Sequence, residues 1–173
     1  MLNGNLAPYY LDEANGWALS VRELSDSLRK AQAKGVAVRG LVVINPGNPT
    51  GQTLSKENMQ EIVQFCSDQG LVLCADEVYQ ENIWTSERPF YSFRKVAYEM
   101  GFTPESNKLQ LASFHSCSKG FLGECGLRGG YVETHGFGAD VMAQFVKQAS
   151  VSLCSNTIGM RELYLVRTWG RLF

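Results

Sequence analysis

The sequence is short of metal-binding residues: it has only two histidines, and its five cysteines include no CxxC pair. Such a set offers few ligand combinations for a structural zinc site, and an odd number of cysteines cannot all pair within one chain. We therefore expect no metal site and interpret the cysteines as reduced thiols with structural roles. They are Cys66, Cys74, Cys117, Cys125 and Cys154.

Strong net charge and long hydrophobic runs are also missing. The formal net charge is −1, and no apolar run approaches the ~20 residues that a membrane-spanning helix requires. A basic surface for nucleic acid or an anionic membrane is therefore not expected, which favours small-molecule partners. The first four residues lack the charged and apolar regions of a secretory signal, so the sequence predicts an intracellular protein, cytoplasmic or mitochondrial.

The order of the elements predicts an α/β fold. Apolar residues at helical spacing follow a capping-box pattern at Ser20 and end near Gly35, before the apolar run 41–44. A second helix, capped by Ser55 and stopped by Gly70, precedes another apolar run at 71–75. Short apolar runs of this kind indicate strands that are buried on both faces. This βαβ order predicts a mostly parallel sheet with flanking helices, and ligands gathering beyond the carboxyl ends of the strands.

The rest of the chain extends this pattern without an internal repeat or a convincing linker. The further elements that we expect are a helix at 92–100, a strand at 109–114, a short strand at 130–133 and a helix at 138–149.

Two loops that follow the predicted strands carry candidate ligand-binding residues. Asp76 comes directly after an apolar strand, so its carboxylate lies at the rim of the sheet, where we expect a cationic partner. Tyr79 lies three residues later and can face the same space. Asn48 lies in a loop rich in proline and glycine, from which its amide can donate to a ligand oxygen. Simpler interpretations stay open, in which Asp76 only caps the next turn and Asn48 is an ordinary turn residue.

The segment 113–130 is the most informative part of the sequence. It contains Ser116, Ser118, Lys119 and Arg128, joined by glycines that let the backbone approach a ligand closely. The Walker order GxxxxGK[ST] is absent. Hydroxyls, a lysine and an arginine suit a phosphate-bearing ligand that also bonds to an amine. The alternative is a flexible, solvated loop.

Three segments resemble, in order and spacing, the class I and II aminotransferases of fold type I, which use pyridoxal 5′-phosphate. They are Asn45-Pro46-Gly47-Asn48-Pro49-Thr50-Gly51, Ala75-Asp76-Glu77-Val78-Tyr79-Gln80, and Ser116-Cys117-Ser118-Lys119-Gly120 with Arg128-Gly129-Gly130. Residues 9–13, 17–19 and 123–126 resemble the alanine aminotransferase branch of that family. The resemblance covers roughly positions 8–159, and three motifs in the correct order make chance agreement improbable.

For the cofactor's aldehyde and phosphate, the resemblance implies four residues. Lys119 would form a Schiff base with the cofactor and move the proton between the substrate Cα and the cofactor C4′, for which desolvation of its amine would help. Arg128 would clamp the phosphate through its planar guanidinium, with Ser116 and Ser118 supplying hydroxyl donors.

For the cofactor's ring, the resemblance implies three more. Asp76 would pair with the protonated pyridine nitrogen and so keep the ring an electron sink. Asn48 and Tyr79 would donate hydrogen bonds to the phenolic oxygen.

The resemblance also implies an architecture and an activity. Residues 1–159 would be part of the cofactor-binding large domain, and residues 160–173, which do not resemble the family, a tail arising from a shifted reading frame or retained intron, or else a short amphipathic helix. The implied reaction transfers an amino group between L-alanine and 2-oxoglutarate, giving pyruvate and L-glutamate, in a homodimer.

Three features of the family have no counterpart that we can place in this sequence: a helix N-terminus for the phosphate, an aromatic residue that stacks on the ring, and an arginine for the substrate carboxylate. We therefore expect this chain alone to be weakly active or inactive. Two alternatives stay open: another enzyme of fold type I, either a different transaminase or a lyase similar to aminocyclopropane-carboxylate synthase, and a non-catalytic chain that pairs with a full-length homologue.

Overall fold

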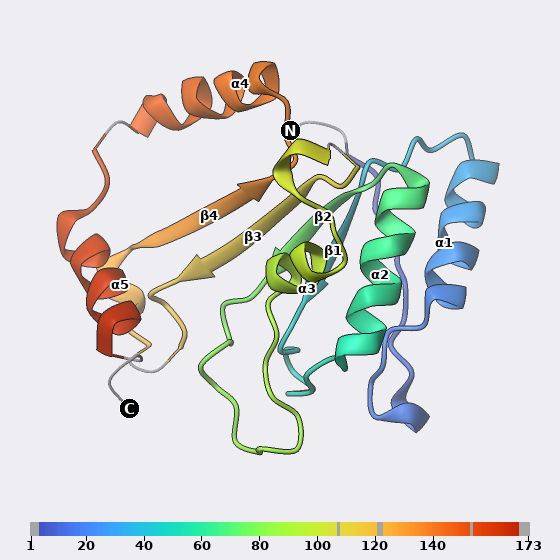
Figure 1. Cartoon of the computed structure of the whole chain (residues 1–173), viewed down its shortest axis with the longest axis horizontal. Coiled ribbons are helices and arrows are strands. Elements are labelled where there is room, and N and C mark those ends of the chain that lie inside the picture. The colour runs from blue at the N-terminus through green and yellow to red at the C-terminus, as the bar shows by residue number, and fades with distance from the viewer. Residues whose placement is uncertain (1–3, 107, 121–122, 153, 170–173) are drawn as a thin grey trace.

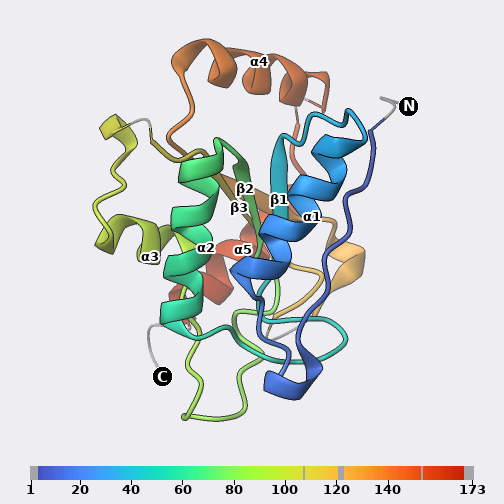
Figure 2. The same ribbon diagram turned by 90° about the vertical axis from the view of Figure 1, so that its right-hand side faces the viewer.

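A four-stranded sheet lies at the centre of the chain, and helices α1 to α3 pack on one of its faces (Figures 1 and 2). The computed structural model describes residues 4–106, 108–120, 123–152 and 154–169. The strand order is β1-β2-β3-β4; the first three strands are parallel and β4 is antiparallel to β3. The predicted α/β fold with a mostly parallel sheet is therefore confirmed.

The elements lie close to their predicted positions. The strands are β1 (Gly40–Ile44), β2 (Val72–Asp76), β3 (Leu111–Ser116) and β4 (Gly130–His135). The α-helices are α1 (Val21–Ala33), α2 (Lys56–Gln69), α3 (Phe93–Glu99), α4 (Ala139–Ala149) and α5 (Thr157–Trp169). Short 3-10 helices occur at Glu13–Asn15, Pro104–Ser106, Cys125–Leu127 and Ser150–Ser152.

The caps of the first two helices differ from each other. At α2, Ser55 Oγ accepts a hydrogen bond from Asn58 N at 3.1 Å, and Gly70 ends the helix at φ 61°. Both features were predicted and are confirmed. At α1, the capping box was wrong, because the Ser20 side chain makes no cap hydrogen bond. Glu23 accepts a hydrogen bond from Tyr10 N at 3.2 Å instead.

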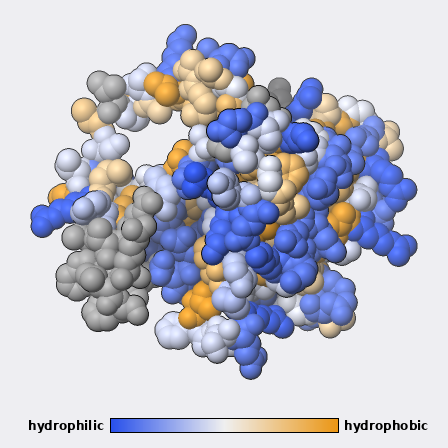
Figure 3. Space-filling model, in the orientation of Figure 1, coloured by the Kyte–Doolittle hydropathy of each residue, from blue (hydrophilic) through white to orange (hydrophobic). Residues whose placement is uncertain are grey.

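The core lies between the sheet and helices α1 to α3. Its fully buried side chains include Leu19, Met59, Ile62, Val63, Leu73, Phe93, Val96 and Leu111. The space-filling view in Figure 3 shows hydrophilic side chains over most of the outer surface of α1 and α2. This arrangement places the carboxyl ends of three parallel strands at one edge of the sheet.

The prediction that β1 is buried on both faces was wrong. Leu41 and Val43 are buried, whereas Val42 is 59% exposed and Ile44 is 40% exposed. Side chains alternate along a strand, and here the helices cover the face that carries Leu41 and Val43. The register aligns Ile44 with Asp76, so the second face carries Asp76.

Helix α4 lies at the top of Figure 1 and α5 at its left, near β4, so both are separate from the layer of α1 to α3. Among the residues that the structure describes, α4 buries none, and hydrophobic side chains show at its surface (Figure 3). Helix α5 packs closely on the loop before β4, so that a Cβ at Gly159 would collide with the backbone of Leu127 and Gly129. Residues 157–169 form helix α5, and Gly170, which the helical interpretation of the tail included, lies outside the described residues, so the nature of the tail stays a prediction.

The boundary at 159 stays a prediction, and α5 crosses it without a break. No helix in the described part of the chain has the length and apolar character that crossing a membrane demands.

Candidate functional site

The loop between β1 and α2 is anchored from its first residue. Asn45 is buried, and its backbone N–H donates to the carbonyl oxygen of Asp76 at 3.0 Å, which joins this loop to the end of β2. The backbone of Gly47 closes the loop, because its N–H donates to the Gln52 carbonyl oxygen at 2.8 Å and its carbonyl oxygen accepts from Gly51 N at 2.9 Å. The loop is therefore held tightly while it presents the exposed Asn48.

A turn after β2 presents Tyr79 to this loop. The N–H of Gln80 donates to the carbonyl oxygen of Glu77 at 3.1 Å, which closes the turn around Tyr79. Asn48 Nδ2 donates to Tyr79 Oη at 3.0 Å. The two residues predicted to bind the same ligand oxygen are thus in contact, although 31 positions separate them.

Asp76 lies at the base of this turn, and its carboxylate is half-buried on the open face of the sheet. Its Oδ1 accepts a hydrogen bond of 3.4 Å from Val78 N. Within the described residues, none of the ion pairs includes Asp76. The expected cationic partner is therefore not supplied by this part of the chain.

His115 lies near Asp76, and sequence reasoning assigned it no role. Burial lowers the pKa of His115, while the Glu77 backbone and the charges of Glu81 and Asp76 act in the opposite direction. Its ring packs edge-on against Tyr131, with 5.5 Å between ring centroids. His115 directly precedes Ser116 in the sequence, on the strand beside β2. This position could have marked it in advance as a neighbour of the candidate site.

Lys119 lies in the turn after β3, with its Nζ 5.5 Å from the centroid of the Tyr79 ring. A cation at this distance from an aromatic face is attracted by the ring's quadrupole. A second link joins the two loops, because Asn82 Nδ2 donates to the Gly120 carbonyl oxygen at 3.4 Å. Lys119 is exposed, so the desolvation that we expected is not found in this structure.

The predicted phosphate-binding residues are engaged with their own loop. Ser116 Oγ donates to the Gly129 carbonyl oxygen at 3.2 Å and accepts from Ser118 N at 3.1 Å. Arg128 adopts a left-handed φ of 50°, and its Nη1 donates to the Cys125 carbonyl oxygen at 2.8 Å. The structure thus brings Ser116 and Ser118 together, and convergence of Arg128 with them on one phosphate stays a prediction.

Comparison with known proteins finds close relatives. Residues 2–163 match the family described as aminotransferase class I and II. The chain is 57% identical over 156 residues to alanine aminotransferase 1, mitochondrial, of Arabidopsis thaliana, covering 90% of this chain and 28% of that protein. It is 55% identical to alanine aminotransferase 2 of Panicum miliaceum and 51% identical to glutamate–glyoxylate aminotransferase 1 of Arabidopsis thaliana, with 90% of this chain and 32% of each protein covered.

Solved structures show the same fold. An aminotransferase from Escherichia coli superposes with a TM-score of 0.69 at 26% identity, over 89% of this chain and 35% of that one. An alanine aminotransferase from Pyrococcus furiosus superposes with a TM-score of 0.67 at 20% identity, over the same shares. The chain spans about a third of the length of the relatives that it matches. With three motifs in order and a family match over almost its whole length, the chain belongs to the class I and II aminotransferase family.

Proposed function

We propose that this chain carries part of the catalytic centre of an aminotransferase that exchanges an amino group between L-alanine and 2-oxoglutarate. The products are pyruvate and L-glutamate, and the cofactor is pyridoxal 5′-phosphate. The observation that supports this most is the meeting of Asn48, Tyr79 and Lys119 beside Asp76, in a chain 57% identical to an alanine aminotransferase.

The residues at the carboxyl edge of the sheet fit this cofactor. Asp76 is a half-buried carboxylate that forms no ion pair within the described residues, so a cationic ring nitrogen is a suitable partner for it. Tyr79 Oη accepts from Asn48, which leaves its own O–H to donate to a phenolic oxygen. When bound, pyridoxal phosphate supplies a ring that accepts the electrons released as the substrate loses its α-proton.

Lys119 would do two tasks with one amine. Its exposed Nζ, 5.5 Å from the centroid of the Tyr79 ring, would bond to the cofactor aldehyde, and the same nitrogen would move a proton from the substrate Cα to the cofactor C4′. Arg128 would exchange its contact with the Cys125 carbonyl for the cofactor phosphate, joined there by Ser116 and Ser118.

A second candidate function is transfer between glutamate and glyoxylate, favoured by the 51% identity to a glutamate–glyoxylate aminotransferase. Both reactions use the same cofactor residues, so they differ in the pocket for the keto acid. Assays with 2-oxoglutarate and with glyoxylate as amino acceptor separate them.

We propose the cytoplasm or the mitochondrion as the compartment, since several relatives are named mitochondrial. We further propose that the protein acts as a homodimer, the assembly that the class I and II aminotransferase family implies. We expect little turnover from the 173-residue chain alone.

The test of this proposal is covalent trapping. The purified chain is incubated with pyridoxal phosphate, reduced with borohydride and digested, and the modified lysine is identified by mass spectrometry. We expect the label on Lys119 and its loss in Lys119→Ala, while Lys147→Ala, on the outer helix α4, keeps it. Equal labelling of many lysines, or undiminished labelling of Lys119→Ala, would refute the assignment.

A further inference from the structure

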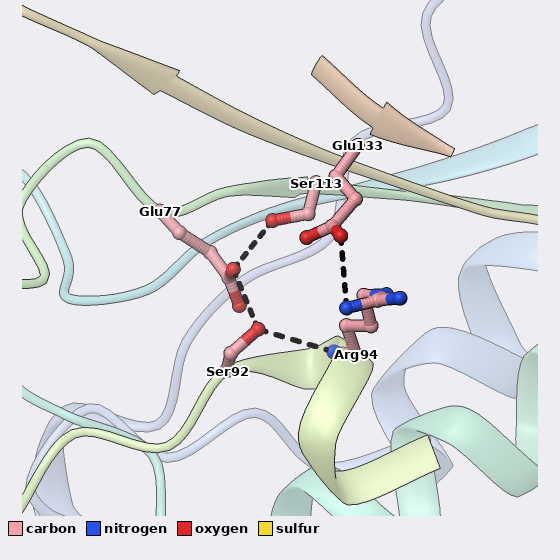
Figure 4. Close-up of polar contacts among 5 residues, drawn as sticks. All are labelled: Glu77, Ser92, Arg94, Ser113 and Glu133. Carbon is pink, nitrogen blue, oxygen red and sulfur yellow. Dashed lines mark hydrogen bonds and ion pairs between the residues drawn. The ribbon is translucent and has the colours of Figure 1, made fainter. Parts of the chain in front are cut away.

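Glu77 is a buried carboxylate beside the candidate site to which the proposed reaction gives no task. It is 3% exposed and follows Asp76 directly. Its Oε2 accepts hydrogen bonds from Ser92 Oγ at 2.9 Å and from Ser113 Oγ at 2.5 Å (Figure 4). Its Oε1 accepts a further hydrogen bond from Phe93 N at 2.7 Å. The donors come from the start of α3 and from β3, so this one side chain joins two elements to the end of β2.

Hydrogen bonds offset only part of the cost of burying this carboxylate. Burial raises the pKa of Glu77, while hydrogen bonds from Ser113, Phe93 and Ser92 act to lower it. The charge of Glu133 on β4 adds to the upward shift. Three donors around two oxygens leave little freedom for the side chain to move.

The backbone of Glu77 is fixed on both sides as well. Its N–H donates to the Phe114 carbonyl oxygen at 3.1 Å, which extends the pairing of β2 and β3 past Asp76. Its carbonyl oxygen accepts from Gln80 N at 3.1 Å and so closes the turn that presents Tyr79. A displacement of Glu77 would therefore shift Asp76 and Tyr79 together.

We infer that Glu77 is a positioning residue of this site: its carboxylate clamps segment 76–80 to β3 and α3, and thereby holds Asp76 and Tyr79 in their binding directions. The cofactor part of this inference rests on the proposed function. The part that concerns the backbone applies to the chain without any ligand.

The variant that tests the clamp is Glu77→Gln, which keeps the size of the side chain but replaces one acceptor oxygen by a donor. Removing an acceptor from a buried network leaves donors unsatisfied, so the segment should open more often. The matched control is Glu133→Gln, which removes a carboxylate from the same region (Figure 4) and its half-exposed ion pair with Arg94, but leaves the three hydrogen bonds to the Glu77 carboxylate in place.

Two measurements test Glu77→Gln: amide hydrogen exchange in segment 76–80 and the affinity for pyridoxal phosphate. Amide hydrogen exchange of the ligand-free chain should become about tenfold faster at Val78 and Gln80 in Glu77→Gln, with the amides of α1 unchanged. The dissociation constant for pyridoxal phosphate, followed by absorbance, should rise about tenfold, and Glu133→Gln should resemble the parent protein in both measurements.

Unchanged exchange at 78 and 80, or equal acceleration throughout the chain, would overturn the inference, since a general loss of core stability affects all elements. If Glu77→Gln fails to fold, Ser113→Ala removes one donor and should give the same local pattern in weaker form. If the parent chain binds no pyridoxal phosphate, the proposed function fails, while hydrogen exchange still decides whether Glu77 clamps the segment.

Discussion

Two neighbouring carboxylates at the end of β2 have opposite surroundings. Asp76 is half-buried on the open face of the sheet, and Glu77 is buried toward the helices. Successive side chains on an extended chain point to opposite faces. In the proposed function, Asp76 would bind the cofactor while Glu77 anchors the same segment, so a substitution at Glu77 should weaken cofactor binding although Glu77 does not touch the cofactor.

Thiol reactivity is a prediction at the scale of single residues. Burial raises the pKa of Cys66 to about 12, whereas Cys125 is exposed. The thiolate is the reactive form, and at pH 8 a pKa of about 12 leaves a thiolate fraction on the order of 10⁻⁴. Iodoacetamide should therefore label Cys125 in the folded chain and Cys66 only after unfolding, as judged by mass spectrometry of timed samples. Equal labelling rates in the folded chain would contradict the burial of Cys66.

At the scale of elements, the sheet has one covered face and one open face. The register places Ile44, Asp76, Phe114 and Val132 in one row on the open face. The side chains of Ile44, Phe114 and Val132 in this row are at least 40% exposed. Apolar residues of a parallel strand therefore need not lie in the core of the described chain. The row also includes Asp76, which places this residue of the candidate site on the face opposite helices α1 to α3.

The two helix caps give a matched prediction. Ser55→Ala should lower the free energy of unfolding by about 1 kcal/mol, because Ser55 Oγ satisfies the N–H of Asn58. Ser20→Ala should cost less than about 0.5 kcal/mol, because the Ser20 side chain makes no cap bond. Urea unfolding of both variants measures the difference. The assignment of the caps is wrong if the two losses are equal.

The two faces of the sheet give a second prediction. Leu73 is fully buried, so Leu73→Ala should cost about 2–5 kcal/mol through lost burial and the cavity left behind. Val42 is 59% exposed, so Val42→Ala should change stability by no more than about 0.5 kcal/mol. Thermal and urea unfolding compare the variants. A large loss in Val42→Ala would show that the second face is covered in solution.

At the scale of the whole molecule, large apolar side chains are exposed in two regions of the surface. Helix α4 exposes Val141, Phe145 and Val146, and the open face of the sheet exposes Val42 and Ile44. Contiguous apolar surface on a protein favours association with other protein surfaces. We expect the exposed apolar residues of α4 and of the open sheet face to promote such association.

Stability against pH is a prediction for the whole molecule. Burial lowers the pKa of His115 below 6.5 in the folded state. Between the folded pKa and 6.5 the unfolded chain binds more protons, so the free energy of unfolding rises with pH there and falls as the solution is acidified. His115→Gln removes this contribution, and its stability should fall less steeply than that of the parent below about pH 6.5.

Urea unfolding at a series of pH values measures the two slopes. Above about pH 7.5, where histidine is neutral in both states, the two curves should run parallel. A steeper acid loss in His115→Gln than in the parent would contradict the burial of this ring.

Local features of this protein were predictable from sequence. Helical spacing identified α1, Ser55 and Gly70 marked the ends of α2, and the apolar runs marked the strands. These features depend on backbone preferences and side-chain periodicity over a few residues, which the sequence contains directly. The motif residues Asp76 and Lys119 were likewise identifiable before the structure, as members of a recognisable pattern.

The partners of individual side chains were decided only by the tertiary structure. Glu23 binds Tyr10 N rather than completing a capping box, and Glu77 is held by Ser92 and Ser113, which lie 15 and 36 positions away. The exposure of Val42 also depends on which face the helices cover. A hydrogen-bond partner or a covering helix comes from where distant segments cross in space, and no local pattern records that crossing.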